Sequence, residues 1–291
     1  MSFRSDKITP FSGNKSLICG NNILKTDKPL VMGILNLTPD SFYDGGLYTT
    51  KDAWIAQTDK MIQEGASIID IGAISTRPGA AEISEDEELS RLIPALETLT
   101  HRYPSIVFSV DTYRSKVVKY SAEAGAGMIN DISAGKFDKD LFDSVAATGL
   151  PYILMHMQGT PSTMQINPAY ENITREVLSF FVQKIATLLK AGIEQIILDP
   201  GFGFGKSIEH NYQLLKQLRV FMETGFPVLV GLSRKSMVYK LLGITAEESL
   251  PATTALHLQS ILNGADILRV HDVREAVQTI KLAETYMTVT E

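Results

Sequence analysis

Polar side chains end a series of short apolar runs, and these are the residues best suited to chemistry. They include the carboxylates Asp70, Asp111 and Asp199 and the amide Asn130. Buried charges are stable only when they are paired or hydrogen-bonded. If these side chains meet in one place, they predict a bound polar ligand. The full set is Asn36, Asp70, Asp111, Asn130, Asp131, His156, Asp199, Arg269 and His271.

Cationic side chains follow the same kind of run. Arg77 lies in a Ser-Thr-Arg-Pro-Gly loop, Arg234 and Lys235 are adjacent, and Arg269 precedes His271 by two positions. The chain has a net charge of −6, so a local cluster of cations indicates a site for a multiply charged anion such as a phosphate ester. Ordinary surface salt bridges are the alternative.

The segment 199–207, Asp-Pro-Gly-Phe-Gly-Phe-Gly-Lys-Ser, invites comparison with nucleotide-binding loops. Its spacing excludes both common types. A P-loop requires glycine where this chain has Pro200, and the dinucleotide fingerprint requires glycine where it has Lys206. The segment is therefore a Gly-rich turn, with Phe202 and Phe204 available to line a pocket.

Some of these residues also have purely structural explanations. Asp70 and Asp131 can cap turns. We expect His156 and His257 to be internal histidines with satisfied hydrogen bonds, because no His-x-x-x-His metal spacing is present. Met157 fits either ordinary core or a soft wall for a flat ring.

The elements that must position these side chains alternate between two patterns. Eight short and nearly continuous apolar runs predict parallel strands covered on both faces, and a helical pattern follows each run. This order favours an α/β fold, a (β/α)8 TIM barrel, over an open doubly wound sheet, and in a barrel the C-terminal ends of the strands share one mouth. The predicted strands are 30–36, 67–70, 106–111, 127–131, 151–156, 194–199, 226–231 and 266–271, and the predicted helices are 50–64, 85–101, 114–124, 138–147, 170–191, 208–219, 246–263 and 272–284.

Length and composition fit one barrel domain. The chain has 291 residues, of which 44% are hydrophobic and 21% charged, and such barrels use about 250 residues. We expect residues 1–28 to form an N-terminal extension that caps the barrel, and residues 29–291 to form the barrel. The acidic balance argues against nucleic acid as a partner, and no apolar run reaches the roughly 18 residues of a membrane span. The single cysteine, Cys19, suits a reducing cytoplasm.

Eight segments in order along the chain carry distinctive motifs. They are Met-Gly-Ile-Leu-Asn-Leu-Thr-Pro-Asp-Ser-Phe (32–42), Ser-Thr-Arg-Pro-Gly-Ala (75–80), Ser-Val-Asp-Thr (109–112), Ile-Asn-Asp-Ile (129–132), Leu-Met-His-Met (154–157), Asp-Pro-Gly-Phe-Gly-Phe-Gly-Lys (199–206), Ser-Arg-Lys-Ser (233–236) and Arg-Val-His (269–271). Together they resemble the motifs of the dihydropteroate synthase family, and the first two loops separate synthases from other pterin-binding barrels.

The resemblance implies a cytoplasmic homodimeric transferase of folate biosynthesis and a sulfonamide target. Its members condense 7,8-dihydropterin-6-ylmethyl diphosphate with p-aminobenzoate to give 7,8-dihydropteroate and diphosphate. The implied cofactor is Mg²⁺, and the implied partners are these small-molecule substrates. One departure stands out: the family commonly has Gly-Gly-Glu before Ser-Thr-Arg-Pro, whereas this chain has Gly72-Ala73-Ile74, which removes a possible support for the second loop.

The resemblance also implies roles for individual residues. The dihydropterin would be held by Asp111, Asn130, Met157, Asp199 and Lys235. The diphosphate would be held by Asn36, Arg77, Arg269 and His271, with Asn36 as a ligand of Mg²⁺. The p-aminobenzoate would be held by Thr76, Arg77, Pro78, Phe204 and Ser236, and the catalytic set would be Asp40, Arg77, Asp111, Asp199 and Lys235.

Two other functions compete with this one. A pterin-barrel methyltransferase would act on methyltetrahydrofolate with a corrinoid partner, and a non-catalytic module would only bind the pterin. Arg77, Arg269 and His271 argue against the methyltransferase, because that enzyme has no diphosphate to bind.

Overall fold

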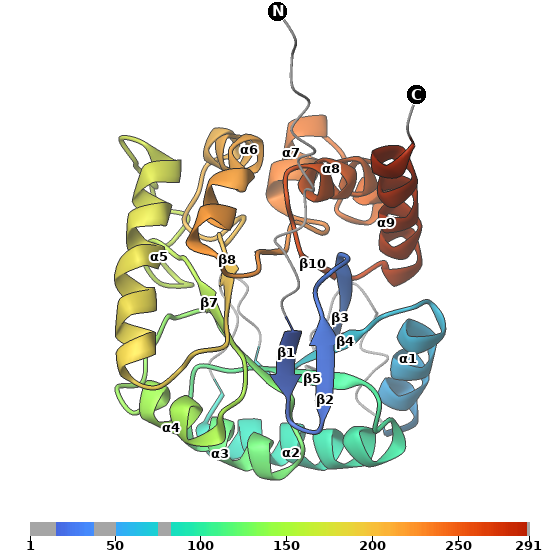
Figure 1. The fold of residues 1–291 in the computed structure, drawn as a ribbon, viewed down its shortest axis with the longest axis vertical. Helices are drawn as coiled ribbons and strands as arrows, with labels where there is room; N and C mark the ends of the chain where they lie inside the picture. Colours follow the sequence, from blue (N-terminus) through green and yellow to red (C-terminus); the bar gives the residue numbers. More distant parts are fainter. Residues whose placement is uncertain (1–15, 38–50, 75–82, 290–291) are drawn as a thin grey trace, which may run out of the picture.

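A parallel sheet that helices surround forms the centre of the molecule. The computed structural model describes residues 16–37, 51–74 and 83–289. Eight of its strands pair in the order β8-β7-β6-β5-β4-β3-β10-β9, and a parallel bridge between Leu198 and Val228 brings the two ends of this sheet together. Figure 1 shows the helices as a ring around these strands. The predicted (β/α)8 barrel is confirmed.

The barrel strands are short and almost entirely buried. This follows from their apolar sequences, because the helices cover one face and the barrel interior covers the other. The seventh predicted strand, 226–231, is longer than the observed β9, which has two residues; Pro227 in this run has no N–H to donate to a ladder. The strands are β3 (Leu30–Asn36), β4 (Ile68–Gly72), β5 (Val107–Asp111), β6 (Met128–Asp131), β7 (Tyr152–Met155), β8 (Ile196–Asp199), β9 (Leu229–Val230) and β10 (Ile267–Val270).

The helices follow one another around the ring in chain order (Figure 1). The sequence analysis missed α7, because its seven residues are too few to show a clear helical period. None of the helices in the described ranges is long and apolar enough to cross a membrane. The helices are α1 (Lys51–Gln63), α2 (Glu85–Arg102), α3 (Ser115–Glu123), α4 (Leu141–Thr148), α5 (Ile173–Lys190), α6 (Ile208–Lys216), α7 (Ser236–Leu242), α8 (Leu250–Leu262) and α9 (Val273–Thr288), with 3-10 turns η1 (Leu218–Thr224) and η2 (Glu247–Ser249).

An antiparallel hairpin of β1 (Ser16–Cys19) and β2 (Asn22–Lys25) precedes the barrel. Leu17 and Cys19 are buried in a cluster with the first residues of several barrel strands, among them Ile68 and Val107. The hairpin therefore packs on the N-terminal end of the barrel, as Figure 1 shows. The division of the chain at residue 28 stays a prediction.

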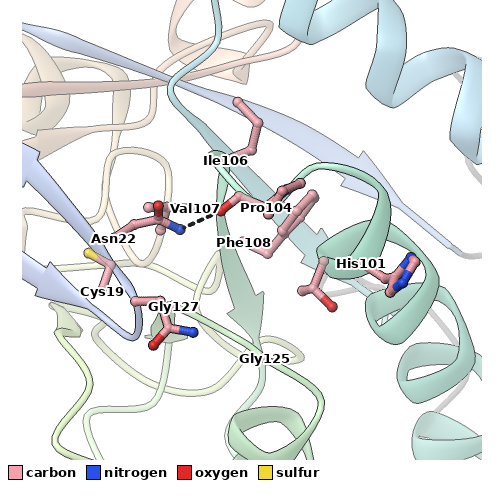
Figure 2. Close-up of a pocket in the computed structure, with 11 residues that line it drawn as sticks. Cys19, Asn22, His101, Pro104, Ile106, Val107, Phe108, Gly125 and Gly127 are labelled. Atoms are coloured by element: carbon pink, nitrogen blue, oxygen red, sulfur yellow. Dashed lines mark hydrogen bonds between the residues drawn. The ribbon is translucent and has the colours of Figure 1, made fainter.

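A cavity of about 280 Å³ lies beside the hairpin (Figure 2). Its lining includes Cys19, Asn22, Val107 and Gly127, and Asn22 Nδ2 donates to the carbonyl oxygen of Pro104 at 3.0 Å. Val107 and Gly127 are at the N-terminal ends of β5 and β6. The cavity is thus at the opposite end of the barrel from the polar strand ends that the sequence singles out.

Candidate active site

The register of the sheet places three of the predicted polar residues in one row. Asn36 at the end of β3 pairs with Gly72, Gly72 with Asp111, and Asp111 with Asn130. A Cβ on Gly72 would lie 3.5 Å from Asp111 Cβ and 3.8 Å from Asn36 Oδ1. The side chains of Asn36 and Asp111 therefore approach the same point at the C-terminal end of β4.

Arg269, on β10, lies between two carboxylates. Its Nε donates to Asp70 Oδ2 at 2.7 Å, and its Nη2 donates to Asp111 Oδ2 at 3.0 Å. Asn130 Nδ2 also donates to Asp70 Oδ2, at 3.0 Å. A guanidinium has five N–H donors, so these two bonds leave further donors for a ligand.

Asp70 is therefore a member of the site that the predicted set of substrate-binding and catalytic residues omits. Its side chain is fully buried and holds Arg269 and Asn130, instead of capping the loop after β4. Its other oxygen, Oδ1, has no hydrogen-bond partner among the described residues. The available signal was a carboxylate within an otherwise apolar strand sequence, Ile68–Gly72.

Burial sets the ionisation of Asp111. Burial and, to a smaller extent, the neighbouring charge of Asp70 raise the pKa of this carboxyl, Arg269 opposes them, and the net result is a pKa of about 7. A ligand that develops positive charge nearby would favour the carboxylate form.

A second polar group lies at the ends of β8 and β9. Asp199 Oδ1 accepts a hydrogen bond from the Gly201 N–H at 2.8 Å. Lys235 Nζ donates to the carbonyl oxygen of Phe202 and lies 4.5 Å from the centroid of the Phe204 ring. Burial raises the pKa of Asp199 and lowers that of Lys235 to about 8, and the attraction between the two opposes both shifts.

Arg269 joins the two groups electrostatically. Its charge lowers the pKa of Asp199 and of Lys235 as well as that of Asp111. The structure therefore brings Asp111, Asp199, Lys235 and Arg269 into one electrostatic neighbourhood, as the sequence predicted.

An apolar wall adjoins these charges. Met157 is buried in a cluster with Ile132, Met155 and Met164, and the partly buried Phe204 packs against that cluster. Sulfur and aromatic side chains make a polarisable surface that suits a flat ring.

The loops after β9 and β10 are bound to each other. Arg234 Nε donates to Asp272 Oδ2 at 3.0 Å, and its Nη2 forms a second bond to the same carboxylate. The hydroxyl of Ser233 lies 3.1 Å from His271 Nδ1. These contacts fix the segment that carries Lys235 and Ser236 next to the segment that carries His271.

Comparisons with known proteins agree with this geometry. The family described as pterin binding enzymes matches residues 32–271. The dihydropteroate synthase of Escherichia coli (strain K12) is 45% identical over 270 residues, which cover 92% of this chain and 95% of that protein. The chain belongs to the dihydropteroate synthase family.

Solved structures of the synthases share this fold. The Yersinia pestis dihydropteroate synthase in a sulfonamide drug complex is 43% identical, with a TM-score of 0.91, and the match covers 94% of this chain and 100% of that one. The Xanthomonas albilineans dihydropteroate synthase with 4-aminobenzoic acid is 41% identical, with a TM-score of 0.88, over 95% and 100% of the two chains. The methyltransferase and the non-catalytic module are therefore not retained.

The purely structural explanations that the sequence suggests are confirmed for Asp131 and His156 and are wrong for His257. Asp131 accepts bonds from the Ser133 and Gly135 N–H groups at 2.6 and 2.8 Å, so its role in a turn is confirmed. The prediction for His156 is confirmed, because its Nδ1 lies 3.1 Å from Lys206 Nζ. It is wrong for His257, whose buried Nε2 has no hydrogen-bond partner in the described part of the chain.

Four predicted site residues, Asp40, Thr76, Arg77 and Pro78, lie outside the described residues. Within the described ranges, no group of three or more His, Cys, Asp or Glu side chains is placed to hold a metal ion. Asn36 contributes a side-chain amide oxygen at the barrel mouth, which is a type of ligand that Mg²⁺ accepts.

Proposed function

We propose that the chain joins 7,8-dihydropterin-6-ylmethyl diphosphate to p-aminobenzoate. The bond between the pterin methylene carbon and the diphosphate oxygen breaks, and the electron pair leaves with diphosphate. The p-aminobenzoate nitrogen then forms the new C–N bond and loses one proton. The observation that carries this proposal is the pair of carboxylates, the partly buried Asp111 and the buried Asp199, around a shared cation, Arg269.

Asp199 and Lys235 suit the polar edge of the dihydropterin. Adjacent N–H donors on the amino-pyrimidinone edge match one carboxylate in a bidentate bond, and ring carbonyl and nitrogen acceptors match an ammonium. Asn130 and Asp111 would extend this contact, while Met157 would lie against the ring face. Burial strengthens each of these bonds, because little water competes for the partners.

Asp111 and Asp199 would also stabilise the reaction. As diphosphate leaves, positive charge spreads over the pterin ring, and two nearby carboxylates lower its energy electrostatically. The ring's capacity to share charge favours a dissociative step. A covalent enzyme intermediate is not required.

Asn36, Arg77, Arg269 and His271 would hold the diphosphate. Asn36 would also be a ligand of Mg²⁺, with further oxygens from the diphosphate. Bound Mg²⁺ would neutralise charge on the leaving group. Arg269 would keep its bonds to Asp70 and Asp111 and offer its other N–H groups to the diphosphate.

Thr76, Arg77, Pro78, Phe204 and Ser236 would form the p-aminobenzoate site. Phe204 contributes an aromatic face, and Ser236 starts α7 next to Lys235. Together with Asp40, the loop that carries Arg77 would close over the diphosphate and exclude water from the electrophile.

The direct test supplies the purified chain with the dihydropterin diphosphate, p-aminobenzoate and Mg²⁺. We expect equal amounts of diphosphate and 7,8-dihydropteroate, measured by a coupled diphosphate assay and by mass spectrometry. Diphosphate release without C–N bond formation would contradict the proposal.

The loop role is tested by Asp40→Asn and Arg77→Met. Each variant should depress the rate of synthesis more than the affinity for dihydropterin. Equal losses of rate and affinity would reject the loop role.

We also propose that the chain forms a cytoplasmic homodimer in which the two copies contact each other through α9. Leu282, Tyr286 and Val289 are spaced by four and three residues and are 68%, 74% and 73% exposed. Such an apolar stripe suits burial against a second copy. Light scattering should give twice the mass of the chain. Tyr286→Glu should give monomers, whereas Tyr120→Glu on α3 should not; a monomeric parent protein would reject the homodimer.

A further inference from the structure

Lys206 is a buried charge that none of the roles above uses. It follows the Gly-rich loop 199–205, and its side chain reaches back under that loop. We propose that Lys206 is a positioning residue for the dihydropterin and p-aminobenzoate sites, because it fixes the Gly-rich loop against the loop after β7. This inference rests on the function proposed above and adds a residue to it.

The surroundings of Lys206 consist of hydrogen-bond acceptors. Its Nζ donates to the carbonyl oxygens of Gly201 and Phe204, both at 2.9 Å, and to that of His156 at 3.2 Å. It also lies 3.1 Å from His156 Nδ1. An ammonium has three N–H donors and no acceptor, so one N–H is shared between the carbonyl oxygen and Nδ1 of His156. Nδ1 is therefore an acceptor, and burial, which lowers the pKa of His156 to about 2, keeps the imidazole neutral.

The two loops are in direct backbone contact. A Cβ on Gly201 would lie 2.0 Å from the His156 carbonyl oxygen, and one on Gly205 would lie 2.5 Å from that of Gln158. The contact buries carbonyl groups, and each buried carbonyl needs a donor. Lys206 supplies this donor to both loops at once, because His156 follows β7 while Gly201 and Phe204 follow β8.

The fixed loop is the one that holds Lys235 and presents Phe204. The Phe202 carbonyl accepts from Lys235 Nζ, and a Cβ on Gly203 would lie 3.1 Å from Lys235 Cδ. Displacement of this segment would therefore move the ammonium assigned to the dihydropterin and the ring assigned to p-aminobenzoate. Within the described ranges, Asn36 on β3 and Arg269 on β10 form no hydrogen bond with this loop, so the diphosphate site should keep its geometry.

The test replaces the ammonium with an apolar chain of similar length, Lys206→Met, and measures three affinities. We expect dihydropterin to bind about tenfold more weakly and the KM for p-aminobenzoate to rise about tenfold, since the loop loses a charged hydrogen-bond centre. Inhibition by diphosphate, measured as a Ki, should stay within about twofold of the parent value, the size of an indirect effect. Dihydropterin binding is measured by calorimetry, which does not require turnover.

Lys184→Met is the matched control, because Lys184 Nζ donates to a single backbone carbonyl, that of Ala134, at 2.8 Å. All three affinities should be unchanged in this variant. A uniform loss of the three affinities in Lys206→Met, or no loss in any, overturns the proposal. If the parent chain binds both substrates but makes no dihydropteroate, the proposed function fails while the calorimetric test of Lys206 still stands.

A second variant tests the positioning role of Lys206 if Lys206→Met does not fold. His156→Leu removes the imidazole acceptor and keeps the backbone carbonyl, so the loop contact is weakened and not abolished. We expect the same selective pattern with smaller changes. A His156→Leu protein with parent-like affinities for dihydropterin and p-aminobenzoate would overturn the proposal.

Discussion

At the scale of single residues, the site depends on charges that are kept out of water. Asp70 and Asp111 are close enough to share one guanidinium, and the charge of Asp70 contributes to the raised pKa of Asp111. Lys235 contacts a carbonyl and an aromatic ring, and its burial lowers the pKa of the ammonium. The protein thus places groups with shifted pKa values where the proposed reaction changes charge.

The pH dependence of dihydropterin binding follows from two of these groups. Asp111 must be a carboxylate, so binding should weaken as the pH falls through its pKa of about 7. Lys235 must be protonated, so binding should weaken as the pH rises through its pKa of about 8. Calorimetry with a dihydropterin that lacks the diphosphate should therefore give an optimum between these values. Asp111→Asn should lose the acidic limb and keep the alkaline one; affinity independent of pH would contradict both assignments.

Arg269 should matter for stability as well as for the diphosphate. Arg269→Met leaves Asp70 and Asp111 without their cation, and removing one partner of a buried ion pair costs about 3 kcal/mol of the free energy of unfolding. The loss should be largest at high pH and shrink as the pH falls, because protonation removes the unpaired charge. Urea unfolding measures this cost. Adding Asp70→Asn should recover part of it; additive losses would show that the two residues do not interact.

At the scale of elements, strands and their following loops fix the directions of the functional side chains. The row Asn36, Gly72, Asp111 and Asn130 is a consequence of parallel register. The glycines of the loop after β8 do not form a phosphate-binding loop. They permit close contact with the backbone of the loop after β7. The ion pair of Arg234 and Asp272 joins the loops after β9 and β10 in a similar way.

Gly201 should be sensitive to substitution for two separable reasons. Its φ is +70°, and an added Cβ would lie 2.0 Å from the His156 carbonyl oxygen. Gly149 has a similar φ of +67° with nothing within 4 Å of the Cβ position. Gly149→Ala should therefore cost only the left-handed strain, about 1 kcal/mol.

Gly201→Ala should cost more than Gly149→Ala and should also weaken dihydropterin binding. Thermal unfolding and calorimetry on the two variants give the comparison. If the two variants lose equal stability and keep the parent affinity, the protein accommodates the added Cβ at Gly201 with no effect on binding, which would contradict this prediction.

At the scale of the whole molecule, the two ends of the barrel have different tasks. The polar strand ends and the proposed chemistry are at the C-terminal end, and the hairpin of β1 and β2 packs on the N-terminal end. A barrel allows this separation, because the strands run the whole length between the two ends.

The separation predicts that the hairpin contributes to the stability of the protein and not to its activity. Leu17 is buried, so Leu17→Ala should lower the free energy of unfolding by about 2 to 4 kcal/mol, the usual cost of an internal Leu→Ala change. The neighbouring Ile18 is 58% exposed, so Ile18→Ala should have little effect. Synthesis rates at a temperature where both variants are folded should equal that of the parent; a selective rise in either KM would show that the two ends are coupled.

The sequence by itself determined the barrel and predicted much of the candidate site. Apolar runs that are continuous rather than alternating identify strands covered on both faces, and parallel order then places their C-terminal residues together. That reasoning, with the motifs, was enough to select Asp111, Asn130, Asp199, Lys235 and Arg269. It could not reveal α7, whose helical period is too short, or the shortness of β9.

Only the tertiary structure decided which partners these residues have. Arg269 and Asp70 are 199 positions apart, and Lys206 contacts His156 across 50 positions. No local pattern encodes such a pair, because the distance between two side chains depends on barrel closure and on how adjacent loops pack. The contacts of Asp70 and Lys206 therefore follow from burial and hydrogen bonding in the folded chain, which the linear sequence does not specify.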